Sequence, residues 1–187
     1  MELVRTTIER YVKLTDAEWA VVQPCWIRRS FVRGTFVSEA GRVEQRFYIV
    51  ERGVQRMYFE HDGGEHCVGF AYDRSWSGDY DSFVSRKPGR FSVQAVTDSQ
   101  LFSIERDDLQ RLFDVLPVMD RFGRLMLEEL ITGRATREIE LLTLSAEERY
   151  RRLMARSAHL LQLVPQKDIA SYLRMTPETF SRLRARS

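Results

Sequence analysis

The feature that most constrains this chain is a change of hydrophobic period near Ile104. Between Cys25 and Ile104, apolar and polar residues alternate in short runs separated by turns, a pattern typical of antiparallel strands. After Ile104, apolar residues recur every three or four positions, as they do in helices. The chain is therefore predicted to be an α+β protein with an N-terminal antiparallel β-roll followed by helices.

The stretch RFYIVERGVQRMYFEHDGGEHCVGFAY gives the clearest strand signal. It predicts three strands, with turns at Arg52-Gly53 and at Asp62-Gly63-Gly64. Two further strands are predicted from RFSVQAV and QLFSI, which flank Thr97-Asp98-Ser99. Strands this short and closely spaced indicate a roll or sandwich and not a parallel sheet.

The longest helical pattern follows Pro117. Its apolar stripe spans more than six turns and consists of Val118, Phe122, Leu125, Met126, Leu130, Ile131, Ile139 and Leu142. A helix this long cannot easily bury its stripe against a compact roll alone. We therefore expect it to pair with the same stripe of a second copy, forming a homodimer. Packing against its own roll is the alternative.

Ser145 and Glu148 stand at capping-box spacing and predict the start of another helix. The predicted division of the chain is a β-roll sensor domain over residues 1–116, a dimerisation helix over 117–144 and a C-terminal domain over 145–187.

Charge is unevenly distributed along the chain. Residues 146–187 hold nine of the 29 Lys/Arg but only four of the 27 Asp/Glu, so the small net charge of +2 hides a basic C-terminal block. Such a block is expected where one end of a protein contacts a polyanion, although an ordinary solvated basic face has the same composition.

Several classes of protein are not expected. No apolar run approaches the ~18 residues of a membrane span, and the start MELVRTTIERYV lacks the apolar core of a signal peptide, so we expect a cytoplasmic protein. Cys25 and Cys67 are interpreted as small core residues. His61, Glu65 and His66 surround a turn without metal-site spacing, so we expect neither a metal nor an enzyme.

The segment QKDIASYLRMTPETFSRLR fits a helix-turn-helix template that starts at Gln166. The template's core positions hold Ile169, Ala170, Leu173, Met175, Phe180 and Leu183. Thr176 caps the second helix, and Pro177 has the preset φ of a first helical residue. Arg174 occupies a turn position that favours glycine because the backbone is left-handed there, at a cost of about 1 kcal/mol.

Three polar residues project together from the other face of the second helix. Arg182 can donate two hydrogen bonds to guanine, Glu178 can accept from cytosine, and Ser181 can contact a base edge. The cations placed to neutralise phosphates are Lys167, Arg184 and Arg186. The pattern predicts binding of double-stranded DNA.

The segment DIASYLRMTPETFSRLR resembles the recognition motif of the Crp/Fnr superfamily of bacterial transcription regulators, and ETFSR is similar to the E-x-x-S-R signature of its Fnr branch. The resemblance covers nearly the whole chain. It implies a cyclic-nucleotide-binding-like jelly roll, a dimerisation helix and a helix-turn-helix, in a homodimer that reads a palindromic operator with a TGA-like half-site. In the other main branch an Arg precedes the Glu, whereas Pro177 stands here, so one base contact is absent.

The family's ligand-binding members hold a cyclic phosphate with a cassette of the form F-G-E-x-A-L…R-A/S-A-x-V-x-A. The corresponding stretch WSGDYDSFVSRKPGRFSVQAV places Gly89 where the phosphate-binding Arg belongs. The resemblance therefore does not favour cAMP in the usual pose, and no cofactor is expected. The candidate effector-pocket residues are Trp76, Gly78, Asp79, Tyr80, Arg90 and Phe91. The aromatic ones either fill the cavity or line an apolar pocket for a different, unknown effector.

A second interpretation stays open. Arg174 departs from the template, and longer family members continue beyond the position of Ser187 into a hairpin wing. The chain is alternatively a dimeric effector-binding or scaffold module with a degenerated DNA-binding end.

Overall fold

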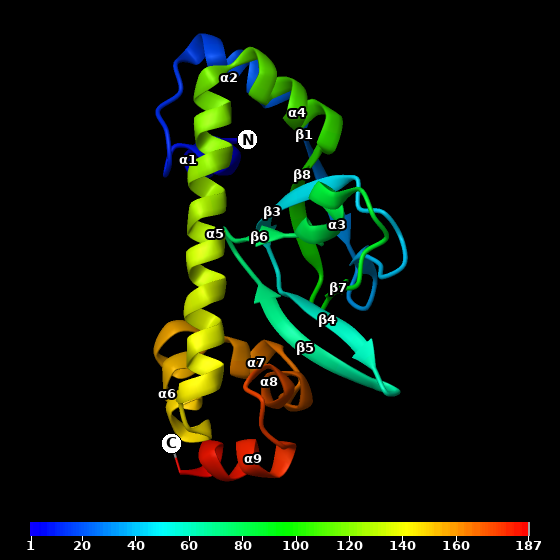
Figure 1. The fold of residues 1–187 in the computed structure, drawn as a ribbon, viewed down its shortest axis with the longest axis vertical. Helices are drawn as coiled ribbons and strands as arrows, with labels where there is room; N and C mark the ends of the chain where they lie inside the picture. The colour runs from blue at the N-terminus through cyan, green and yellow to red at the C-terminus, as the bar shows by residue number, and fades with distance from the viewer. Residues whose placement is uncertain (187) are drawn as a thin grey trace.

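The computed structural model describes residues 1–186, and Ser187 lies outside the described residues. Figure 1 shows a β-roll beside one long helix, with small helices at each end of that helix. Two short α-helices and a 3-10 helix precede the roll: α1 (Glu2–Ile8), α2 (Asp16–Val22) and η1 (Gln23–Cys25). Within the described residues, no helix is long and apolar enough to cross a membrane.

Two four-stranded antiparallel sheets form the roll, in the orders β1-β8-β3-β6 and β2-β7-β4-β5. The strands are β1 (Trp26–Phe31), β2 (Phe36–Ser38), β3 (Arg46–Arg52), β4 (Gln55–His61), β5 (Gly64–Ala71), β6 (Trp76–Ser77), β7 (Ser92–Ala95) and β8 (Ser99–Glu105). This architecture confirms the α+β class and the antiparallel roll predicted from the alternating pattern.

The predicted turns are present. Gly53, Asp62 and Gly63 have φ angles of 104°, 50° and 72°, and they separate β3, β4 and β5. The strands β7 and β8 also form where predicted, yet they belong to different sheets. The chain around Thr97 therefore crosses from one sheet to the other.

Helix α5 (Pro117–Thr143) follows α4 (Arg106–Val115). The burial of its apolar residues changes along its length. Its first half packs on the roll, where Met119, Phe122 and Met126 are at most 2% exposed. Its second half leaves Ile131, Ile139 and Leu142 between 60% and 79% exposed. The chain's own roll therefore covers only the first part of the apolar stripe.

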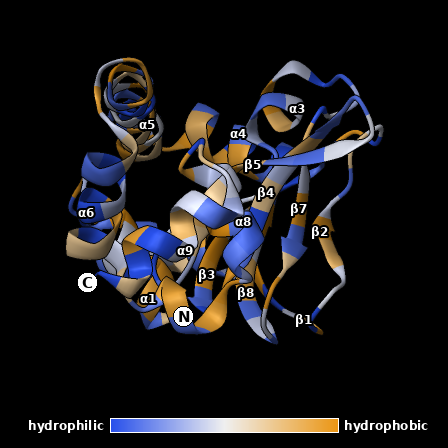
Figure 2. Ribbon diagram, turned by 90° about the horizontal axis from the view of Figure 1, so that it is seen from below, coloured by the Kyte–Doolittle hydropathy of each residue, from blue (hydrophilic) through white to orange (hydrophobic). Residues whose placement is uncertain are grey.

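Four helices complete the chain: α6 (Ala146–Ser157), α7 (Leu160–Leu163), α8 (Gln166–Tyr172) and α9 (Pro177–Ala185). The predicted capping box at Ser145 and Glu148 starts α6. Figure 2, seen from the end that carries α9, shows α8 beside the β4–β5 hairpin. Cys25 and Cys67 are free and buried, as expected of small core residues.

Candidate nucleic-acid interface

The core of the helix-turn-helix forms as the template predicts. Ile169, Ala170 and Phe180 are fully buried, and Leu173 is 1% exposed. The two remaining template residues, Met175 and Leu183, are partly buried against the same cluster. Tyr150 of α6 adds an edge-on contact to the Phe180 ring, at 5.8 Å between centroids. The two helices are thus held by apolar packing that leaves the other face of α9 free.

Arg174 adopts the left-handed backbone that its template position requires, with φ of 54°. The turn is supported by Arg149 of α6, which donates from Nε to the Leu173 carbonyl at 2.8 Å and from Nη2 to the Arg174 carbonyl at 3.3 Å. These two bonds to backbone carbonyls help to hold a left-handed turn without glycine. Sequence reasoning missed Arg149 because it lies outside the template.

The three predicted base-reading residues lie on the exposed side of α9. Glu178, Ser181 and Arg182 are all exposed. The Thr176 hydroxyl accepts from the Thr179 amide and caps the helix. The backbone amide of Glu178 and the side chain of Thr176 hold the pKa of the Glu178 carboxyl below its usual value, so it stays an acceptor.

The predicted phosphate contacts are also solvent-accessible. Lys167 is exposed at the start of α8, and Arg184 and Arg186 are exposed at the end of α9. Within residues 1–186, neither these three cations nor Arg182 forms an ion pair with a carboxylate. Their positive charge is therefore available to a polyanion.

The inner side of α8 packs on the roll, a contact that sequence reasoning missed. Arg56 of β4 forms a buried ion pair with Asp168, and the Cys67 amide of β5 donates to Ser171 Oγ at 3.0 Å. Phe70 of β5 packs against Tyr172 with 5.2 Å between ring centroids. The available sequence signal for this contact was weak. It consisted of two polar side chains, Asp168 and Tyr172, on the side of a short helix that the structure buries.

The candidate effector-pocket residues lie in different environments. Trp76 and Tyr80 pack on Phe47 at 5.0 and 4.9 Å between centroids, inside the core. Arg90 is exposed and pairs with Asp81 at 3.0 Å. Phe91 alone among the six lines the cavity between β5 and α5. The structure therefore does not gather the six side chains around one hollow.

Gly78 and Asp79 form a turn whose carboxylate is hydrogen-bonded within the protein. Gly78 has φ of 105°, and the carboxylate of Asp79, 2% exposed, accepts from the Ser82 and Phe91 amides at 3.3 and 3.4 Å. A Cβ at Gly89 would lie 2.3 Å from Asp79 Oδ2. A carboxylate thus occupies the space beside the position where the family's phosphate-binding Arg belongs.

The histidine-containing hairpin holds no cluster suited to a metal ion. His61 lies 3.3 Å from Asp62, and Glu65 is engaged by Arg56 at 2.7 Å. Across residues 1–186, no group of three His, Cys, Asp or Glu side chains is arranged to hold one.

Comparison with known families assigns the roll to a known type of domain. Residues 28–115 match the family model of the cyclic nucleotide-binding domain. No curated protein matches the chain significantly. Solved structures match over most of the chain, among them one from Eubacterium rectale described as a regulator of the Crp/Fnr family, with a TM-score of 0.70 and 13% identity, covering 92% of this chain and 83% of that one.

The chain has the Crp/Fnr fold. FixK2 from Bradyrhizobium japonicum is also similar, with a TM-score of 0.71, 19% identity and coverage of 86% of this chain and 83% of its own. The catabolite activator protein of Thermus thermophilus matches with a TM-score of 0.58 and 23% identity. This match covers 92% of the present chain and 83% of that protein. Coverage this high means that the structural match extends beyond the roll to the long helix and the C-terminal helices.

Proposed function

We propose that the chain is a cytoplasmic bacterial transcription regulator of the Crp/Fnr type that binds DNA as a homodimer. The observation that carries this proposal is the exposed triad Glu178, Ser181 and Arg182 on a capped helix whose opposite side is buried. A recognition helix needs such a division, because one face must hold the helix to the protein while the other enters the major groove.

Each residue of the triad has a defined role in this proposal. The guanidinium of Arg182 donates to O6 and N7 of a guanine, the carboxylate of Glu178 accepts from a cytosine amino group, and the Ser181 hydroxyl contacts a base edge. Arg182 Nη2 lies 3.3 Å from Thr179 Oγ1, a weak contact that base binding can replace. Lys167, Arg184 and Arg186 bind phosphates and add affinity without sequence preference.

The exposed half of α5 supports the homodimer. Ile131, Ile139 and Leu142 form an apolar surface that a second copy of α5 would bury. A two-fold axis through this contact presents two α9 helices, which matches a palindromic operator with half-sites about one helical turn, roughly 34 Å, apart.

The sensor domain in this proposal does not bind cAMP in the usual pose. The buried Asp79 carboxylate already takes the Ser82 and Phe91 amides, and its charge repels a phosphate at Gly89. Calorimetric titration with cAMP and cGMP tests this inference. Micromolar binding of either nucleotide would show that the cassette opens.

Selection from a randomised duplex pool, followed by salt titration of the selected site, tests DNA recognition. We expect a palindromic consensus and an affinity that falls steeply with salt. Arg182→Ala should weaken consensus binding by about tenfold or more and relax the preference at one position, because a bidentate base contact contributes about 1–3 kcal/mol.

Two control variants make the selection specific. Arg184→Ala should weaken all sequences evenly, as loss of a phosphate contact does. Arg151→Ala, on the exposed side of α6 and paired with Glu147, should change little. A pool with neither a consensus nor a salt-dependent affinity would instead favour the dimeric effector-binding or scaffold module.

A further inference from the structure

Two arginines bind the C-terminal end of α8, where the first helix of the helix-turn-helix meets the turn. The carbonyls of Tyr172, Leu173 and Arg174 accept from the guanidinium groups of Arg137 and Arg149. The three carbonyls before them accept from amides within the turn itself, at 2.9 to 3.1 Å. Carbonyls at a helix end lack partners within the helix and favour a nearby cation. The end of α8 is therefore completed by side chains from outside the motif.

Arg149 joins the end of α5 to this turn. It lies in the first turn of α6, which starts at the Ser145 cap. Long side chains of a helix point back toward its N-terminus. The Arg149 guanidinium therefore reaches the C-cap of α5, where Nη1 donates to the Leu144 carbonyl. Its Nε and Nη2 donate to the carbonyls of Leu173 and Arg174, at 2.8 and 3.3 Å. One side chain thus holds both ends of the connection.

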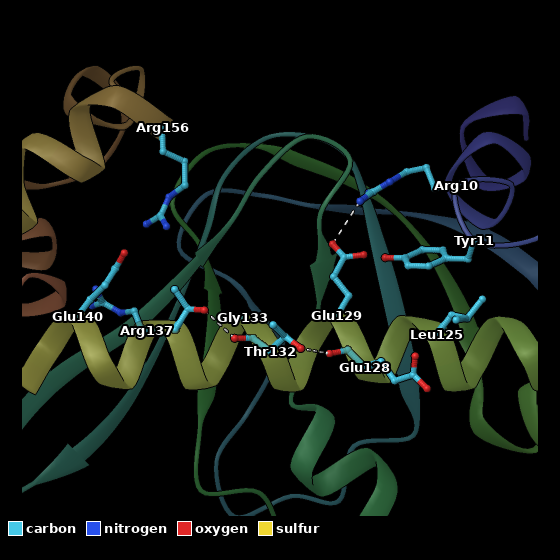
Figure 3. Close-up of a pocket in the computed structure, with 11 residues that line it drawn as sticks. Arg10, Tyr11, Leu125, Glu128, Glu129, Thr132, Gly133, Arg137, Glu140 and Arg156 are labelled. Atoms are coloured by element: carbon cyan, nitrogen blue, oxygen red, sulfur yellow. Dashed lines mark hydrogen bonds and ion pairs between the residues drawn. The ribbon is translucent and has the colours of Figure 1, made fainter.

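Arg137 makes the second connection, directly from α5. Figure 3 shows Arg137 and Glu140 on α5, with Arg156 extending from α6. Nη2 of Arg137 donates to the Tyr172 carbonyl, and its guanidinium carbon lies 3.7 Å from the centroid of the Tyr172 ring. Arg156 Nη2 lies 3.1 Å from the Tyr172 hydroxyl. The last residue of α8 is thus held from both α5 and α6.

These polar contacts matter because apolar packing does not connect α5 to the helix-turn-helix. Among residues 1–186, the hydrophobic cluster that contains Phe180 draws on the roll and on the helices after α5, and includes no residue of α5. The inner side of α8 is attached to the roll through Arg56 and Asp168. A helix attached along one side can still pivot about that side. A second attachment, at its C-terminal end, removes this freedom.

We propose that Arg137 and Arg149 are positioning residues that fix the angle between α5 and the recognition helix α9. In a homodimer formed through α5, this angle sets the separation of the two α9 helices and hence the spacing of the half-sites. That consequence for the operator rests on the proposed function, whereas the fixed angle within one chain does not. Neither arginine is assigned to a base or a phosphate, so its effect on DNA binding comes from the position of α9.

A distance measurement within one chain tests the angle without DNA. Spin labels at Arg121→Cys on α5 and Arg184→Cys on α9 occupy exposed positions, whereas Cys25 and Cys67 are buried. Double electron–electron resonance is recorded with labelled chains diluted into unlabelled chains, so that only distances within a chain contribute. We expect one narrow distribution.

Two variants should widen this distribution. Arg149→Lys keeps the charge, but a single ammonium cannot span three carbonyls as the guanidinium fork does, so we expect a width at least about twice that of the unmodified chain. Arg137→Met keeps the apolar stem, loses the donor and should act in the same direction. Arg151→Lys is the matched control, because Arg151 is exposed on α6 and pairs with Glu147. It should leave the distribution narrow.

Half-site spacing provides the measurement with DNA. One base pair added between the half-sites of the selected palindrome shifts them by about 3.4 Å and rotates them by roughly 35°, so the unmodified chain should bind it at least about tenfold more weakly. In Arg149→Lys this preference should fall below about threefold, with the same preferred bases in each half-site. A variant that merely folded less well would weaken both duplexes by one factor and leave the preference unchanged.

The proposal is overturned if Arg149→Lys and Arg137→Met both keep the narrow distribution, or if both keep the full spacing preference. Should Arg149→Lys fail to fold, as loss of its thermal transition would show, Arg137→Met decides. A pool that yields no selected duplex contradicts the proposed function, and the distances within one chain then decide the positioning role alone.

Discussion

Arg56 of β4 and Asp168 of α8 form a buried ion pair across 112 residues of sequence, with 2.9 Å between Nη1 and Oδ1. The same guanidinium also donates to Glu65 at 2.7 Å and to Gln94 at 2.8 Å. Burial lowers the pKa of Arg56, but the neighbouring carboxylates outweigh that effect and raise it overall. One arginine thus joins two strands next to β4 to the first helix of the helix-turn-helix.

Asp168→Asn should destabilise the chain by about 2 kcal/mol, because the largely buried Arg56 loses its buried carboxylate partner and keeps only the partly exposed Glu65. Urea unfolding measures this change. Glu65→Gln is the matched control: its carboxyl is 37% exposed, so we expect a loss below about 1 kcal/mol. Equal losses in the two variants would contradict the special role of the buried pair.

Hydrogen exchange of one backbone amide gives a second measurement of the packing of α8 on β5. The Cys67 amide donates to Ser171 Oγ only while α8 packs on β5. Its hydrogen exchange should be faster in Asp168→Asn than in Glu65→Gln. An unchanged rate would mean that α8 stays docked without the ion pair.

Arg174→Gly should stabilise the chain by about 1 kcal/mol, because glycine adopts a φ of 54° without the steric cost of a side chain. Thermal unfolding measures the shift. Arg184→Gly, the same replacement within α9, should destabilise by about 1 kcal/mol. If both variants were destabilised alike, the strain assigned to the turn would be wrong.

Ile131→Lys should dissociate the proposed homodimer, because it places a charge in the apolar surface of α5. Light scattering should then report a mass near the 22.0 kDa of one chain, against twice that mass for the unmodified protein. Ile27→Lys, on an exposed position of β1, is the control and should remain dimeric. A monomeric unmodified protein would refute the homodimer itself.

The Cys67 thiol should make stability fall with rising pH. Burial raises its pKa to about 12, so the folded chain keeps a proton that the unfolded chain loses near pH 9. The folded state therefore binds more protons between pH 9 and 12, and stability decreases across that window. From pH 8 to 10, the unmodified chain should lose about 1 kcal/mol more stability than Cys67→Ser, as urea unfolding can measure. Parallel pH curves would exclude this effect.

The helix-turn-helix was the part most accessible to prediction. Its core residues, its cap at Thr176 and its left-handed turn at Arg174 all lie between Ile169 and Leu183, so spacing alone identifies them. The roll was predictable as a class because alternation reports which side of a strand is buried. The assignment of β7 and β8 to opposite sheets could not be predicted. Their alternation would be the same if the two strands paired within one sheet.

By itself, the amino-acid sequence determined the alternation that forms β3, β4 and β5, the caps that start α6 and α9, and that Glu178, Ser181 and Arg182 point outward together. Only the tertiary structure decided the long-range partners: Asp168 for Arg56, Tyr172 for Arg137 and Asp79 beside Gly89. The physical reason is that periodicity records the burial of a side chain, which many partners could provide. Packing of distant segments selects one of them, and among residues 1–186 it leaves the Nε of Arg137 without a hydrogen-bond acceptor.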